Sequence, residues 1–203
     1  MAEDEPLDAR RKGGGKRRYE QRVRPPPKPL DEQKLRDLSL SYVARFSTSA
    51  AKLERYLARK LRERGWSEDE GARPDIAALV ARYVELGYID DAAYAKSKAG
   101  SLLRRGYGAR RVGQALYADG IAEDVRIAVD PEEAARREAA IVLARKRRFG
   151  PFFMGELDSA RAEKQTAAML RAGHGFDAVR TVIHARDEAA LQEWLAEAAD
   201  PLE

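Results

Sequence analysis

One pattern recurs three times along this chain and constrains its fold more than any other. A large apolar residue is followed four positions later by a glycine and then by one further side chain. The copies are Leu61-x-x-x-Gly65-Trp66, Leu116-x-x-x-Gly120-Ile121 and Met169-x-x-x-Gly173-His174. Glycine commonly ends helices, because it takes the left-handed backbone conformation without strain. In the third copy, we expect Phe176 to supply the apolar group that His174 lacks.

The copies lie about fifty residues apart, a spacing typical of helical repeat proteins. Each copy follows a long helical pattern and precedes a short one that carries Ile or Val. Modules of this size gain stability by stacking on their neighbours. No strand pattern occurs anywhere in the sequence. We therefore predict an all-α fold, in which tandem three-helix repeats stack into an elongated, curved solenoid with a disordered N-terminal tail.

The predicted domain boundaries follow the repeat. Residues 1–29 are rich in Gly, Pro, Lys and Arg and have no periodicity, so we predict a disordered basic tail. Apolar residues at spacings of three and four, such as Leu53, Leu57 and Leu61, predict helices from residue 31 onwards. The predicted modules are 30–88, 89–130 and 131–186, followed by an acidic C-terminal helix at 187–203.

The composition argues against several functional classes. The chain has no cysteine, which excludes disulfides and thiolate metal sites. No apolar run approaches the roughly 20 residues that span a bilayer, and no secretory signal is present, so we expect a cytoplasmic protein without a membrane partner. His174 and His184 lack the clustered ligands of a zinc site, and Asp90-Asp91 is better explained as a helix cap. We expect neither catalytic activity nor a metal or cofactor.

The net charge of +4 lies in the predicted tail. Residues 1–29 contain nine Lys or Arg and five Asp or Glu, which leaves 29 of each kind in residues 30–203. Basic faces on this neutral part must be balanced by acidic faces elsewhere. That distribution favours a polarised protein-binding surface.

The longest one-signed stretch lies in the second predicted module. Residues 92–118 contain six Lys or Arg and no Asp or Glu. A helical wheel places Tyr94, Lys98 and Arg105 together, away from the apolar stripe of the helix that begins near Asp91. Arginine pairs well with carboxylates and phosphates, although most charge runs are only solvated faces. The candidate partner-binding residues are Lys96, Lys98, Arg104, Arg105, Arg110, Arg111, Arg145, Arg147 and Arg148.

The chain resembles the RecX family, bacterial regulators of the recombinase RecA, over roughly residues 31–185. The resemblance rests on three stretches: Leu53 to Gly65-Trp66, Ile89-Asp90-Asp91-x-x-Tyr94-Ala95 through Leu116-x-x-x-Gly120-Ile121, and Ala144 to Lys146 together with Gly173 to Ile183. It departs at Gly173-His174-Gly175-Phe176, where the family usually has Arg-Gly followed by an aromatic residue. The resemblance implies three tandem three-helix repeats that lie in the groove of a RecA–single-stranded DNA filament. It implies inhibition of RecA ATPase, strand exchange and filament growth in recombination, DNA repair and the SOS response.

Two hypotheses about function remain open from the sequence. The first is a monomeric filament regulator that contacts RecA, helped by DNA through its basic faces and tail. The alternative is an autonomous helical nucleic-acid-binding protein, which contacts the phosphate backbone with the tail and the arginine pairs. The neutral balance of residues 30–203 favours the first hypothesis.

Overall fold

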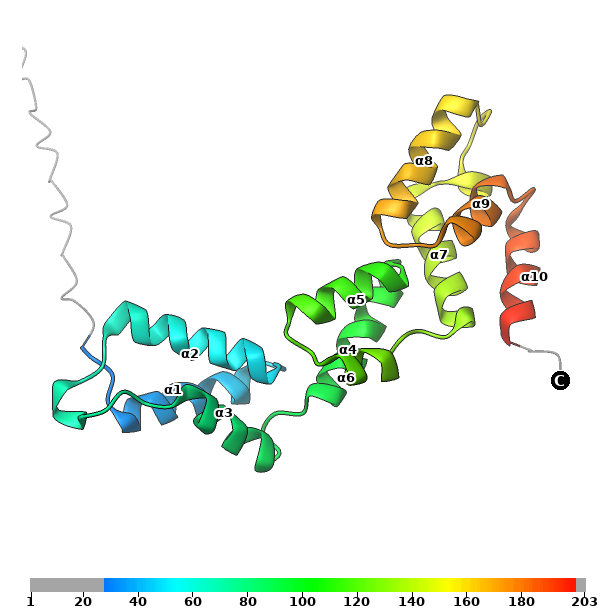
Figure 1. Cartoon of the computed structure of the whole chain (residues 1–203). Helices are drawn as coiled ribbons and strands as arrows, with labels where there is room; N and C mark the ends of the chain where they lie inside the picture. Colours follow the sequence, from blue (N-terminus) through cyan, green and yellow to red (C-terminus); the bar gives the residue numbers. More distant parts are fainter. Residues whose placement is uncertain (1–27, 200–203) are drawn as a thin grey trace, which may run out of the picture.

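The computed structural model describes residues 28–199 and contains only helices there. Residues 200–203 lie outside the described range. So does the predicted tail, apart from its last two positions, 28 and 29. Ten α-helices and two short 3-10 helices are present in 28–199, and the only β pairing in that range is an isolated bridge between Leu30 and Trp66. The predicted all-α architecture is confirmed, and Figure 1 shows the helices arranged along an elongated, curved path.

The helices form three groups, each with its own hydrophobic core. The first group is α1 (Glu32–Arg45), α2 (Ala50–Arg64) and α3 (Ile76–Glu85). The second is α4 (Asp91–Arg104), α5 (Ala109–Ala118) and α6 (Glu123–Ala128). The third is α7 (Glu133–Arg147), α8 (Ser159–Arg171) and α9 (Phe176–His184), against which α10 (Glu188–Ala199) packs. The three cores are built mainly around Leu53 and Leu57, around Val112 and Leu116, and around Met169 and Val182. We propose 30–88, 89–130 and 131–186 as the modules.

Local capping signals explain where several of these helices begin. In several cases, the side chain of the residue before a helix accepts a hydrogen bond from a backbone N–H in the first turn of that helix. These residues are Asp31, Ser49, Asp75, Asp90 and Asp158. These bonds satisfy donors that have no partner within a helix. Asp90 is therefore a helix cap, as the sequence indicated.

The first junction between modules brings the start of α2 against the end of α5. Gly120 has a φ of +80°, the left-handed conformation that the repeat predicted. A Cβ at Gly120 would overlap the Cβ of Ala51 in the first turn of α2. Beside this contact, the Ser49 hydroxyl donates to the Asp119 carbonyl at 2.6 Å. The glycine therefore both ends its own helix and admits the neighbouring module.

The second junction repeats this arrangement with α5 and α8. A Cβ at Gly173 would lie 2.7 Å from the Cβ of Arg111 and 2.5 Å from its backbone nitrogen. The Gly108 N–H donates to the Ala172 carbonyl at 3.0 Å, and the Arg110 N–H donates to the Gly173 carbonyl at 3.2 Å. The start of α5 is thus hydrogen-bonded directly to the end of α8. Figure 1 shows α2, α5 and α8 following one another along the molecule.

Gly65 provides an internal comparison for the other two repeat glycines. It also has a positive φ, +76°, and it ends α2. No module precedes it among the described residues, and nothing lies within 4 Å of the position that its Cβ would take. Close packing at Gly120 and Gly173 is therefore a property of the junctions and not of the helix-ending turn.

His174 occupies the apolar position of the third repeat itself. Its side chain is buried, and its Nε2 donates to the Gly106 carbonyl at 3.1 Å, across the second junction. Phe176 is 61% exposed, so the expectation that it supplies the missing apolar group is wrong. Burial lowers the pKa of His174, because it disfavours the charged imidazolium, and the bond to Gly106 only partly opposes this effect.

Replacing Gly120 with alanine should destabilise the protein more than the same change at Gly87. Both glycines have positive φ and end helices through similar hydrogen bonds, but only Gly120 contacts another module. Gly87→Ala should cost about 1 kcal/mol for the left-handed backbone. Gly120→Ala should cost about 1–3 kcal/mol more, because Ala51 must move. Urea unfolding followed by circular dichroism measures both losses, and equal losses would contradict the junction contact.

His174 should make stability depend on pH. Its pKa in the folded protein lies below the unfolded value of about 6.5, so the unfolded chain binds a proton first as the pH falls. The contribution of His174 is therefore fully present above about pH 6.5 and is lost as the pH falls further. We expect wild type to lose more stability than His174→Gln between about pH 7.5 and 5.5. Glutamine retains an N–H donor but does not titrate, so parallel pH profiles would contradict this assignment.

Candidate interaction surface

Four arginines of the second module are exposed on its surface. They are Arg104, Arg105, Arg110 and Arg111. Within residues 28–199, no salt bridge involves any of them. Arg105 lies over the Tyr107 ring at 5.2 Å from its centroid. Their guanidinium groups therefore remain available to carboxylates or phosphates of a partner.

The structure brings Arg105 together with Arg147 from the third module. Both line a cavity of about 410 Å³, with Lys146 and Arg171 contributing two more cations. Tyr107 and Phe149 add aromatic rings to the same wall, and no acidic residue lines it. We refer to this space, between the ends of α4, α7 and α8, as the inter-module cavity. It joins candidate residues that are more than forty positions apart in the sequence.

Two candidate residues have partners within the chain. Lys98 lies 3.2 Å from Asp119, and Arg145 pairs with Glu188 of α10 while lying over the ring of Phe152. The remaining two, Lys96 on α4 and Arg148 after α7, are exposed and do not line the inter-module cavity. The nine candidates therefore do not form a single face.

Tyr94 is buried at the first junction, although the helical wheel placed it on a side with exposed cations. It is 7% exposed, and its hydroxyl donates to Asp119 at 2.6 Å while accepting from Lys52 at 2.9 Å. Burial would raise the pKa of Asp119, but the hydrogen bonds from Tyr94 and Lys98 and the charge of Lys52 outweigh it and hold this pKa below its usual range. The first module covers this side of α4, a contact that periodicity within one helix cannot reveal.

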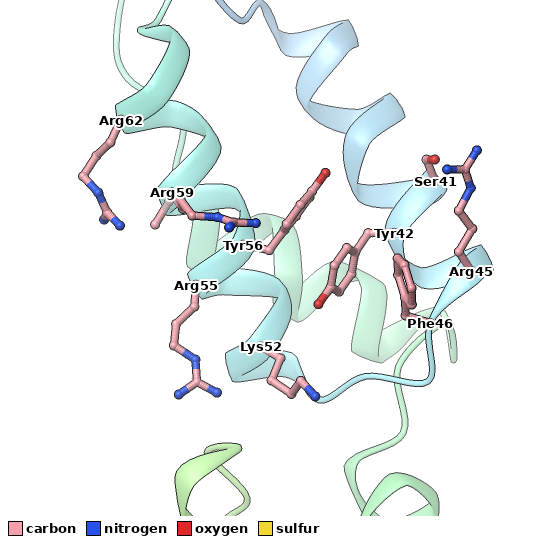
Figure 2. A pocket seen from close by; sticks show the side chains of 10 residues that line it. Ser41, Tyr42, Arg45, Phe46, Lys52, Arg55, Tyr56, Arg59 and Arg62 are labelled. Carbon is pink, nitrogen blue, oxygen red and sulfur yellow. The ribbon is translucent and has the colours of Figure 1, made fainter.

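A larger basic concavity lies on the first module, where the sequence analysis placed no site. It has a volume of about 720 Å³ and lies between α1 and α2, and we call it the α1–α2 groove. Five cations and no acidic residue line it: Arg45, Lys52, Arg55, Arg59 and Arg62. Figure 2 shows Tyr42 on α1, Phe46 just after its end and Tyr56 on α2, beside the arginines that succeed one another along α2.

The aromatic rings of the α1–α2 groove contact one another. Tyr42 and Tyr56 stack with ring centroids 4.3 Å apart, and Tyr42 also meets Phe46 at 5.2 Å in a tilted arrangement. Phe46 is 55% exposed. The cations alone could be read from α2 as a row at spacings of three and four. That row resembles an ordinary solvated face, and only the fold adds the rings of α1 to it.

The two histidines of the chain lie in different environments. His174 is buried at the second junction and His184 is exposed at the end of α9. Across residues 28–199, no group of three or more metal-ligating side chains comes together. Within the same range, none of the helices combines the length and apolarity needed to cross a membrane.

The fold and its surfaces define a class of protein: a helical repeat protein with basic concavities on its modules. Comparison with solved structures agrees, since the crystal structure of RecX from Lactobacillus salivarius matches with a TM-score of 0.58 at 19% identity. That match covers 74% of this chain and 93% of the other, and it shows the shared fold.

Sequence comparison identifies the family. Residues 90–127 match the family model described as RecX, second three-helix domain. The regulatory protein RecX of Myxococcus xanthus (strain DK1622) is 31% identical over 179 residues, covering 84% of this chain and 95% of the relative. The regulatory protein RecX of Agrobacterium fabrum (strain C58 / ATCC 33970) is 34% identical over 125 residues, covering 60% of this chain and 66% of the relative. The chain belongs to the RecX family.

Proposed function

We propose that this chain binds the RecA–single-stranded DNA filament and inhibits RecA ATPase, strand exchange and filament growth. It would act in recombination, DNA repair and the SOS response, as a monomeric cytoplasmic regulator without catalysis of its own. The observation that carries the proposal is the 31% identity to a regulatory protein RecX along 84% of the chain. The regulatory role comes from that relative, and the link to RecA comes from the family.

The structure supplies surfaces that suit this function. An array of modules presents an extended surface, which suits a partner that is itself extended. Arg104, Arg110 and Arg111 are exposed on its second module, and the inter-module cavity holds further cations. A filament of protein on DNA offers both carboxylates and phosphates, the two groups that guanidinium binds in a bidentate manner.

The alternative of an autonomous nucleic-acid-binding protein is favoured by one observation. The α1–α2 groove combines cations with aromatic rings, a combination suited to phosphate and base contacts. The two proposals differ in what they require. Filament regulation requires an effect on RecA, whereas autonomous binding requires only DNA.

Removing the exposed arginines of the second module should weaken inhibition of RecA while leaving the fold intact. The variant replaces four residues with alanine: Arg104, Arg105, Arg110 and Arg111. Exposed substitutions usually change stability by less than about 0.5 kcal/mol each. The backbone N–H groups that hold the second junction also remain. Affinity for the filament should fall by about tenfold or more, equivalent to about 1.4 kcal/mol, and the difference should shrink as salt rises.

RecA ATPase on single-stranded DNA, titrated with each variant at low and high salt, measures this loss. The control variant removes the same charge elsewhere by replacing the exposed Arg36, Arg73, Arg82 and Arg180 with alanine. It should inhibit like wild type. If the second-module variant also inhibits like wild type at both salt concentrations, this surface does not contact the filament. If wild type leaves RecA ATPase unchanged, the proposed function is wrong.

A further inference from the structure

The α1–α2 groove carries more cations than the fold of the first module requires. Lys52 and Arg55 have structural partners at the first junction: Lys52 donates to the Tyr94 hydroxyl, and Arg55 donates to the Ala118 carbonyl at 2.8 Å. The other three are Arg45, Arg59 and Arg62, and all are exposed. Of these, only Arg59 forms a salt bridge within residues 28–199, at 3.8 Å from Glu63. Lys52 also lies 3.9 Å from Asp119, so acidic side chains compensate the positive charge of the groove only in part, and Arg45 and Arg62 have no salt bridge among the described residues.

The cations of α2 are arranged as a row along one side of the helix. Lys52, Arg55, Arg59 and Arg62 follow one another at spacings of three, four and three residues. At 1.5 Å of rise per residue, the row extends about 15 Å, with one cation per turn. A linear polyanion lying along α2 would meet each of them in succession. A compact anion would meet only one or two.

Aromatic rings lie beside this row and distinguish between possible polyanions. The stacked rings of Tyr42 and Tyr56 lie between the helices, and Phe46 exposes more than half of its surface at the rim. The Arg59 guanidinium lies over the Tyr56 ring at 5.7 Å. Unpaired bases stack on aromatic rings and on guanidinium planes while the backbone phosphates contact cations. Acidic side chains would use the cations but carry no ring to stack on these aromatic residues, and a duplex keeps its base faces inside its own stack.

We infer that the α1–α2 groove binds a segment of single-stranded nucleic acid, with phosphates along α2 and a base on Phe46. This goes beyond the proposed function, because a strand can occupy the groove in the absence of RecA. It also assigns a role to the first module, which contains none of the nine candidate residues. The groove supplies non-sequence-specific contacts, since every base has a face that can stack.

The charge part of this inference is tested by fluorescence anisotropy with a labelled oligothymidylate and the full chain. The groove variant replaces Arg45, Arg59 and Arg62 with alanine, and it should bind about tenfold more weakly or worse at about 50 mM salt. Losing three phosphate contacts should also reduce the slope of log K against log salt by about 2. The matched control removes three exposed arginines from the same module: Arg36, Arg73 and Arg82. It should change affinity by less than about twofold.

The stacking part is tested by an uncharged substitution. Phe46→Leu should weaken oligothymidylate binding by about fivefold or more without changing the salt slope, because it removes a ring and no charge. The matched control is Phe176→Leu, which replaces an aromatic residue of similar exposure on α9. This control variant should bind like wild type. Circular dichroism checks the helicity of every variant. If the groove variant loses helicity, the comparison of Phe46→Leu with Phe176→Leu alone decides whether the groove binds the strand.

Several outcomes would overturn the inference. Equal effects of the groove variant and its control would show that only overall charge matters, and an unchanged affinity in both would place the DNA contact elsewhere. A groove variant that loses polyglutamate binding but retains oligothymidylate binding would identify an acidic protein segment as the occupant. Duplex binding as tight as single-strand binding, and equally sensitive to the groove variant, would overturn the single-strand assignment. None of these measurements includes RecA, so they do not depend on the proposed function.

Discussion

The close approach of two glycine-containing turns to the first turns of neighbouring helices is the constraint on which this structure depends. At Gly120 and Gly173, the left-handed conformation ends a helix, and the missing side chain lets the preceding module come within contact distance. Gly108 adds a second requirement at the later junction, since its own Cβ would overlap the backbone at Gly173. Each module has its own core. The relation between modules is therefore set by these small contacts and the polar groups around them, together with the packing of α4 against α7.

Those polar groups make the junctions directional. At the second junction, the N–H groups of Gly108 and Arg110 donate to carbonyls at the end of α8. N–H groups at the start of α5, which have no partner within their own helix, thus bond to carbonyls at the end of α8. The positive partial charge at the start of α5 and the negative partial charge at the end of α8 also attract each other. At the first junction, side chains of the first module take this part: the Ser49 hydroxyl donates to the Asp119 carbonyl, and Lys52 donates to the Tyr94 hydroxyl. Directional bonds fix an orientation that a small apolar contact alone would leave variable.

The sequence predicted the features that depend on neighbours along the chain. The helices from residue 31 onwards, the Asp90 cap and the left-handed glycines all follow from residues within a few positions of one another. Prediction from the sequence failed where a neighbouring module determines whether a side chain is buried. Tyr94 is polar enough to be placed outside, yet the first module buries it. His174 replaces an apolar residue because the Gly106 carbonyl, 68 positions away, gives its N–H a partner. The α1–α2 groove escaped detection because its lining residues are divided between two helices.

The use of backbone N–H groups at the start of α5 leaves the arginine side chains there free for other contacts. Arg110 and Arg111 take part in the second junction through their backbones and Cβ atoms, whereas their side chains are exposed. A junction residue can therefore carry a charge toward a partner without weakening the array, so long as the backbone is unchanged. The same junctions fix the separation between the α1–α2 groove and the inter-module cavity. Under the proposed function, that separation matters because two basic sites on one chain can engage a filament together only if the repeat of the filament matches the distance between the sites.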